Sequence, residues 1–208
     1  MMEKTPYSKT ETKETSESKM EFLPILKYKE QIEEAVLKNP SAVIVGETGC
    51  GKTTQVPCFV LETLGLDANV LVTQPRRLAA CSVAERVAWQ VGCKVGEEVG
   101  YRIRFEDETT AGTRITFATD GILLRELQAD PLLMNYDVVM IDEAHERSKN
   151  IDFVLGLTKE AQSKRQQHNF RPLKVIVTSA TIEKEKFAKY FDEAPTVEVP
   201  GRLYPIEI

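Results

Sequence analysis

Gly46-Glu47-Thr48-Gly49-Cys50-Gly51-Lys52-Thr53 is the stretch of this chain that decides its fold. An apolar run at 42–45, typical of a buried strand, comes directly before it, and a stretch with helical spacing follows at 52–64. Glycines let backbone N–H groups curl around an anion, and the N-terminus of a following helix adds the positive end of its dipole. A glycine-rich turn with an accidental lysine is the alternative, but the flanking elements favour a functional loop. The sequence therefore predicts a phosphate-binding P-loop.

Individual residues of this loop have individual expected roles. Lys52 is expected to reach the β- and γ-phosphates of a nucleoside triphosphate, and the Thr53 hydroxyl is expected to ligate Mg²⁺. The other loop residues, with Thr54 at the start of the helix, are expected to line the nucleotide. We therefore expect ATP or another nucleoside triphosphate, together with magnesium, as the ligands.

Apolar runs elsewhere in the chain predict the rest of a sheet. They lack the alternation of a half-exposed strand and are separated by stretches with helical spacing, which is typical of a parallel sheet covered by helices on both faces. The predicted strands are 42–45, 69–74, 113–118, 136–142, 173–179 and 204–208, and the predicted helices run from Ile25 to a break at Asn39-Pro40 and over 52–64, 78–91, 122–127, 151–166 and 183–191. The predicted fold class is α/β, with a mostly parallel central sheet.

Length and charge set limits on the organisation and the partners. With 208 residues and 42% hydrophobic content, the chain can bury one substantial core. We expect a disordered polar leader at 1–21, rich in Lys, Glu, Thr and Ser, followed by a single domain at 22–208. The net charge of −5 gives no global electrostatic reason to expect a nucleic-acid partner, so such a partner must be argued from local residues.

Cysteine spacing and hydropathy indicate the environment of the protein. The cysteines match neither a zinc knuckle nor a CxxC pair: they are Cys50, Cys58, Cys81 and Cys93. Reduced thiols in a cytosol are the simplest interpretation. The start of the chain is polar, and no apolar run approaches the ~20 residues that span a bilayer. We therefore expect a cytoplasmic protein without a membrane partner.

Two carboxylates stand at the end of the predicted strand 136–142. Asp142 and Glu143 are expected at the carboxyl edge of the sheet, where open α/β sheets bind ligands. Asp142 is the expected Walker B carboxylate that holds magnesium. Glu143 is expected to belong to the metal site as well, and to orient or deprotonate the attacking water. An apolar run that ends in Asp-Glu is by itself more often an ordinary strand end. Because a P-loop is also present, the Walker B interpretation is favoured here.

Phosphoryl transfer also needs compensation of the charge on the γ-phosphate, often by an arginine. We find no arginine in a segment that can be argued to reach the γ-phosphate of the chain's own nucleotide. The pattern therefore favours a partner domain or subunit that supplies this arginine.

The tetrapeptide Asp142-Glu143-Ala144-His145 resembles the signature of the DEAH-box helicases of superfamily 2. Other segments resemble the motifs of that family in the same order: Gly46 to Thr53 is similar to motif I, Thr73-Gln74-Pro75-Arg76-Arg77 to motif Ia, Thr119-Asp120-Gly121 to motif Ib and Ser179-Ala180-Thr181 to motif III. The stretch from Thr119 onward is most similar to the bacterial HrpA-type members. The resemblance covers about 22–208, and chance agreement of so many ordered motifs is negligible.

This resemblance implies a RecA-like P-loop NTPase domain, the first of two tandem copies. In the family, the nucleotide lies in the cleft between the copies, and single-stranded RNA lies across both. The chain matches only the first copy, whereas the second carries the arginine fingers. The resemblance thus implies half of an ATP-dependent RNA helicase, with weak or no turnover by this half alone. The sequence does not identify a protein activator.

The resemblance also implies roles for single residues near the nucleotide. Ser179, Ala180 and Thr181 are similar to the family residues that couple hydrolysis to strand movement, and His145 is expected to link the carboxylates to them. Arg86 resembles the family arginine that stacks on the nucleotide base, although a solvated helix arginine is the alternative. Because stacking tolerates any base, poor discrimination among nucleotides would follow.

Candidate RNA contacts lie at predicted strand ends and in one adjoining loop. Hydroxyls, arginines and backbone N–H groups there are expected to grip phosphates and sugars: Thr73, Arg76, Arg77, Arg104, Phe105, Thr119, Asp120 and Gly121. A charged helix start is the alternative for Arg76-Arg77, although positive charge at a helix N-terminus opposes the helix dipole.

Two other functions stay open at this point. The chain could act alone as a nucleotide- or RNA-binding module without turnover, because its hydrolysis site is incomplete. It could also belong to a DNA-directed helicase, because the choice of RNA rests on family analogy.

Overall fold

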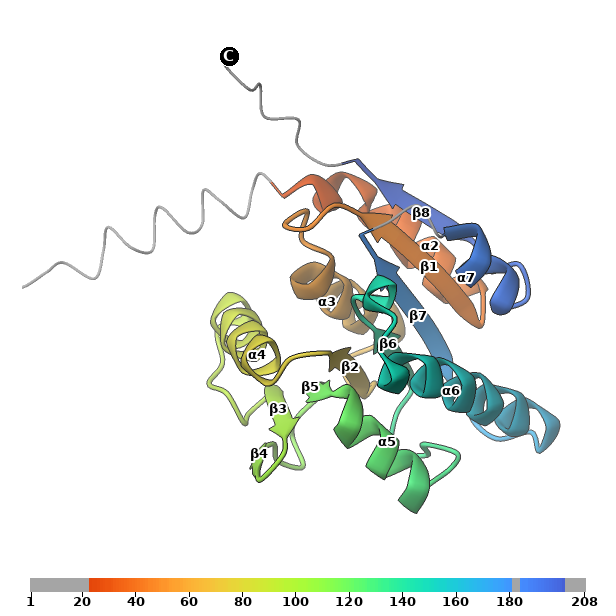
Figure 1. The fold of residues 1–208 in the computed structure, drawn as a ribbon. Coiled ribbons are helices and arrows are strands. Elements are labelled where there is room, and N and C mark those ends of the chain that lie inside the picture. The colour runs from red at the N-terminus through yellow and green to blue at the C-terminus, as the bar shows by residue number, and fades with distance from the viewer. Residues whose placement is uncertain (1–22, 181–183, 201–208) are drawn as a thin grey trace, which may run out of the picture.

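A computed structural model describes residues 23–180 and 184–200 of the chain. Its centre is an eight-stranded sheet in the order β4-β3-β5-β2-β6-β7-β1-β8 (Figure 1). The strands are β1 (Ser41–Gly46), β2 (Val70–Gln74), β3 (Val99–Ile103), β4 (Glu106–Glu108), β5 (Ile115–Thr119), β6 (Val138–Ile141), β7 (Lys174–Ser179) and β8 (Thr196–Val199). All neighbouring strands pair in parallel except β3 and β4, so the predicted α/β class with a mostly parallel sheet is confirmed.

Helices cover both faces of this sheet (Figure 1). They are η1 (Pro24–Tyr28), α2 (Lys29–Lys38), α3 (Lys52–Leu64), α4 (Arg77–Val91), α5 (Asp120–Ala129), η2 (Ala144–Glu146), α6 (Lys149–Gln167) and α7 (Lys184–Tyr190). The predicted helix from Ile25 is divided into a 3-10 turn and α2, and α3 has its predicted bounds. The expected leader at 1–21 and the expected strand 204–208 lie outside the described residues.

Strand β2 shows why the apolar runs are continuous. Val70 and Val72 belong to the apolar cluster to which α2, α3 and α4 contribute on one face, whereas Leu71 between them belongs to the cluster with α5, α6 and α7 on the other. Successive side chains of a strand point to opposite faces, so a strand buried on both faces needs apolar residues at consecutive positions. The two apolar clusters that result hold the sheet between two layers of helices.

Three strands were not predicted, namely β3, β4 and β8. The first two form one edge of the sheet, where Gly100 interrupts the apolar pattern and β4 consists of Glu106, Asp107 and Glu108. Glycine is required at position 100 because a Cβ there would lie 2.2 Å from the carbonyl oxygen of Glu108. Strand β8 forms the other edge and is flanked by Pro195 and Pro200, which edge strands tolerate.

The parallel arrangement brings the carboxyl ends of the strands to one edge of the sheet. The P-loop follows β1, Gln74 ends β2, Thr119 ends β5, Asp142 follows β6 and Ser179 ends β7. Most of the predicted site residues therefore lie along a single edge.

None of the helices in the described part of the chain is both long and apolar enough to span a membrane.

Candidate nucleotide site

The backbone of the P-loop depends on glycine at three positions, one of which is Gly49 with a left-handed φ of 83°. Gly51 has a left-handed φ of 103°, and a Cβ there would lie 2.8 Å from Cγ2 of Ile25. A Cβ on Gly46 would lie 2.9 Å from the Cys50 sulfur and equally close to the Val199 carbonyl oxygen. Helix α3 starts at Lys52 without a side-chain cap, so its first N–H groups are free to bind an anion. The loop thus has the form that the sequence predicts for a phosphate cradle.

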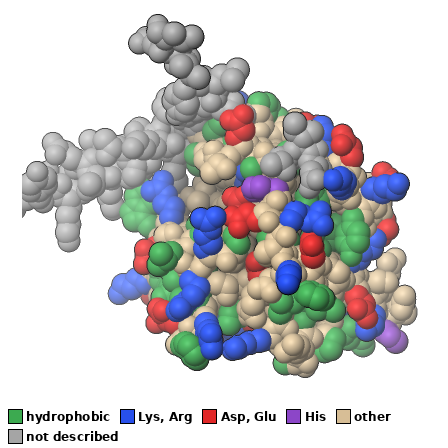
Figure 2. Space-filling model, in the orientation of Figure 1, with side chains coloured by type: hydrophobic (Ala, Val, Ile, Leu, Met, Phe, Trp, Pro, Cys, Tyr) green, Lys and Arg blue, Asp and Glu red, His purple; other side chains and the backbone are tan. Residues whose placement is uncertain are grey.

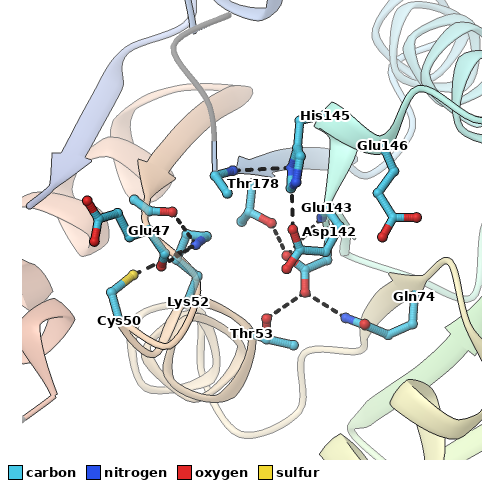
Figure 3. A network of polar contacts seen from close by, with 12 residues as sticks. Glu47, Cys50, Lys52, Thr53, Gln74, Asp142, Glu143, His145, Glu146 and Thr178 are labelled. Carbon is cyan, nitrogen blue, oxygen red and sulfur yellow. Dashed lines mark hydrogen bonds and ion pairs between the residues drawn. The ribbon is translucent and has the colours of Figure 1, made fainter. Parts of the chain in front are cut away.

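Lys52 lies under this loop, with only 4% of its surface exposed. Its ammonium donates hydrogen bonds to the carbonyl oxygens of Gly46 and, at 3.0 Å, Glu47, and it lies 3.8 Å from the Cys50 sulfur (Figure 3). All of these acceptors are uncharged. Phosphate oxygens would be stronger acceptors, because hydrogen bonds between charged groups are stronger than bonds to neutral ones.

Asp142 is the centre of the polar network in Figure 3. Its Oδ2 accepts hydrogen bonds from the Thr53 hydroxyl and from the Gln74 amide, both at 2.6 Å. Its Oδ1 accepts from the Thr178 hydroxyl and, at 3.0 Å, from the backbone N–H of Glu143. The carboxylate is fully buried, and these donors compensate its charge.

Gln74 and Thr178 were not among the predicted site residues. Gln74 lies within the motif Ia-like stretch, and Thr178 directly precedes Ser179, the first residue of the motif III-like stretch. A polar side chain at the last positions of an otherwise apolar strand is the signal that could have found them.

Glu143 turns away from β6 with a left-handed φ of 53°, which is uncommon for a residue other than glycine. Such strain often marks functional sites. Burial, and then the charge of Asp142, raises the pKa of the Glu143 carboxyl, while His145 and Lys52 oppose that rise. A raised pKa makes this carboxylate a better proton acceptor.

His145 connects Glu143 to the end of β7. Its Nδ1 lies 3.3 Å from Oε2 of Glu143 and accepts a hydrogen bond from the backbone N–H of Ala180 at 3.2 Å (Figure 3). The structure therefore brings together the carboxylate, the histidine and the motif III-like segment, and their coupling role stays a prediction. Ser179 is buried at the end of β7, and Thr181 lies outside the described residues.

Beside the P-loop is a cavity of about 310 Å³. Thr48, Gly49, Lys52, Thr53 and Thr54 line it together with Arg86, Glu143 and an unpredicted pair, Gln55 and Gln90. The two glutamines exchange hydrogen bonds of 2.8 and 3.1 Å between α3 and α4. The guanidinium of Arg86 lies 4.7 Å from the ring centroid of Trp89, within the range of a cation–π contact.

A magnesium ion at this site would have few protein ligands. The described residues contain no cluster of three or more His, Cys, Asp or Glu side chains that could enclose a metal. Thr53 and Asp142 nevertheless place a hydroxyl and a carboxylate oxygen next to each other. That set fits Mg²⁺, which typically takes one or two protein oxygens and completes its shell with phosphate and water.

Four of the predicted RNA contacts form an exposed cluster at the same edge of the sheet. Arg76 pairs with Glu146 at 3.3 Å, Arg77 donates to the carbonyl oxygen of Arg104 at 3.2 Å, and the Arg104 guanidinium lies 4.7 Å from the Phe105 ring centroid. Phe105 is 89% exposed. Across the face in Figure 2, acidic side chains lie among the basic ones, so the cluster is local rather than part of a large basic surface.

Thr73 and Asp120 are different from that cluster, because both are buried. Their side chains cannot grip RNA in this arrangement, and that part of the prediction needs correction. Thr73 and Asp120 are neighbours, but among the described residues neither the Thr73 hydroxyl nor Oδ1 of Asp120 forms a hydrogen bond of good geometry. Burial raises the pKa of Asp120 to about 6; the neighbouring Thr73 hydroxyl opposes that rise, and the charges of Glu146 and Asp142 add to it. Thr119 and Gly121 are partly buried on either side of Asp120.

Comparison with known proteins agrees with this geometry. The DEAD/DEAH box helicase family matches residues 27–189. The ATP-dependent RNA helicase HrpA of Borreliella burgdorferi is 50% identical over 188 residues, which are 89% of this chain and 22% of that protein. HrpA of Escherichia coli is 48% identical over 188 residues, again 89% of this chain but 14% of that protein. The chain thus spans less than a quarter of the length of these curated relatives.

Proposed function

We propose that this chain, which belongs to the DEAD/DEAH box helicase family, is the ATP-binding half of an ATP-dependent RNA helicase. The resemblance predicted from the motifs is confirmed by the family match and by the HrpA relatives. The observation that carries the proposal is the Asp142 network. Through this one carboxylate, hydrogen bonds join the P-loop to the ends of β2 and β7.

Each part of the site has a proposed task. Backbone N–H groups of Gly49, Gly51 and the start of α3 hold the phosphates, and Lys52 neutralises their charge. Thr53 and Asp142 hold magnesium, which supplies further charge compensation on the phosphates when bound. Glu143 accepts a proton from the attacking water, and Arg86 stacks on the base.

The second half of the site is proposed to come from another RecA-like domain. The relatives are four or more times longer than the matched segment, which leaves room for such a domain in a longer protein. That domain would supply the arginine opposite the P-loop. The proposed state of this chain alone is therefore nucleotide binding with little turnover.

Single-stranded RNA is the proposed track, held by the exposed cluster of Arg76, Arg77, Arg104 and Phe105. Arginines would contact phosphates, and the exposed ring would stack on a base, so that little sequence is read. The printed names of the HrpA relatives describe RNA helicases, and this supports RNA over DNA. A cytoplasmic location is proposed because all four cysteines are free thiols.

The decisive experiment measures ATP hydrolysis by the longer protein with and without single-stranded RNA, and with DNA of equal length. RNA-selective stimulation supports the proposal, whereas equal or greater stimulation by DNA favours a DNA-directed helicase. Glu143→Gln should abolish turnover and retain nucleotide binding, and Lys52→Ala should weaken binding itself. Glu160→Gln, an exposed change on α6, is the matched control. Nucleotide binding without turnover in the unaltered longer protein would favour a binding module.

A further inference from the structure

A second polar cavity, of about 400 Å³, opens at the amino edge of the sheet, opposite the P-loop. It lies where β2 and β5 begin and where the chain enters β6. Arg102, Arg114 and Arg171 line it, together with Asn69, Thr110 and Thr116. None of these residues has a task in the proposed motor function.

The arginines of this cavity are not equally neutralised. Arg102 pairs with Asp107 and Glu126, and Arg171 pairs with Asp137 at 2.8 Å. The guanidinium of Arg114, by contrast, donates among the described residues to the neutral side-chain oxygen of Asn69, at 3.1 Å. Within residues 23–180 and 184–200, no carboxylate forms an ion pair with it. One guanidinium charge at the cavity is therefore uncompensated.

A hydroxyl in the same cavity also lacks a partner. Thr116 is 7% exposed on β5, and its hydroxyl makes no hydrogen bond to the described part of the chain. Because this side chain lines the cavity, its hydroxyl can donate a hydrogen bond to a molecule bound there or accept one from it.

We propose that this cavity binds a small phosphate-bearing ligand, anchored by Arg114 and Thr116. Planar guanidinium groups match phosphate oxygens, and a phosphate has enough acceptor sites for several arginines and a hydroxyl at once. The volume lies within the range of small-molecule pockets and is short for a polymer track. Because the nucleotide site lies at the other edge of the sheet, the two sites can be occupied independently.

The test is a titration of the ¹⁵N-labelled 208-residue chain with inorganic pyrophosphate, followed by amide chemical shifts. Shifts at Val70, Arg114 and Thr116 are expected in addition to any shifts at the P-loop. Arg114→Gln should weaken pyrophosphate binding at the amino edge by about tenfold or more, because a charged hydrogen bond is lost. Arg125→Gln, an exposed change on α5, should leave both sets of shifts unaltered.

Thr116→Val keeps the shape of the β-branched side chain and should also weaken pyrophosphate binding at the amino-edge site. This second variant tests the proposal even if Arg114→Gln does not fold. Shifts confined to the P-loop, or unchanged affinity in Thr116→Val, would overturn the proposal. A short single-stranded RNA that shifts the same amino-edge amides at lower concentration than pyrophosphate would also overturn it, in favour of RNA. These outcomes do not depend on ATP hydrolysis, so the cavity and the proposed motor function can fail separately.

Discussion

Asp120→Asn should make the protein more stable at neutral pH. Asp120 is the first residue of α5 and is 4% exposed, and its Oδ1 forms no hydrogen bond of good geometry with the described residues. Burial raises its pKa from 3.8 to about 6 in the folded chain. Ionisation of this carboxylate therefore costs more free energy in the folded state than in the unfolded state. Asparagine has nearly the same shape but carries no charge, so it removes this cost.

The magnitude follows from the two pKa values. A rise from 3.8 to about 6 corresponds to a cost of about 3 kcal/mol when the carboxylate is ionised in both states. Below pH 3.8 the group is protonated in both states and contributes nothing. Its contribution to stability therefore falls as the pH rises from 3.8, and it reaches its full unfavourable value above about pH 6. For a chain of this size, each kcal/mol is worth ~2–4 °C in Tm.

Urea unfolding at a series of pH values from about 4 to 8 measures this effect, with the native chain and Asp120→Asn compared at each pH. Contributions of other groups cancel in the difference. The variant should gain up to about 3 kcal/mol at the upper end of the series and little at the lower end. The exposed change Asp67→Asn is the control and should show no such trend. A variant that is less stable at pH 7.5, or a difference that does not vary with pH, would refute the reasoning.

Other predictions concern packing, the network and the RNA cluster. Arg165→Met should destabilise the chain by about 3 kcal/mol or more in urea unfolding, because Arg165 is fully buried and donates to the carbonyl oxygens of Leu132, Leu133, Tyr136 and Arg171. A loss below about 1 kcal/mol would show that these acceptors find other donors. Thr178→Val should lower kcat more than nucleotide affinity, since it removes one donor to Asp142, and equal losses in single-turnover and binding assays would contradict that. Phe105→Ala should weaken RNA binding by ~5- to 100-fold without changing its salt dependence, whereas Arg77→Ala should reduce the salt slope as well. Fluorescence anisotropy at several salt concentrations separates the two.

The sequence predicts the middle of the sheet better than its edges. Central strands such as β2 and β7 are buried on both faces, so their apolar runs are long and easily seen. Edge strands bury less, and β4 has no buried residue at all. Their existence depends on pairing with a neighbour, which a single sequence does not display.

The site residues also fall into two groups, those that the sequence predicts and those that it does not. The P-loop, Asp142 and His145 were predicted because their local spacing carries the chemistry. Gln74 and Thr178 were missed because their importance arises from contacts with Asp142 over large separations along the chain. The buried positions of Thr73 and Asp120 also depend on packing, which their motif-like neighbours conceal.

The hydrogen bond from Gln74 to Asp142 has a thermodynamic consequence. Gln74 is separated from the exposed arginines only by Pro75, and the same carboxylate oxygen also accepts from the Thr53 hydroxyl beside the phosphates. If nucleotide binding draws this oxygen toward a metal, the amide of Gln74 loses part of its acceptor and the end of β2 is released. A coupling free energy between two sites is reciprocal. If nucleotide binding changes the affinity for RNA by some factor, RNA binding must then change the affinity for nucleotide by the same factor. One glutamine on β2 would transmit both effects.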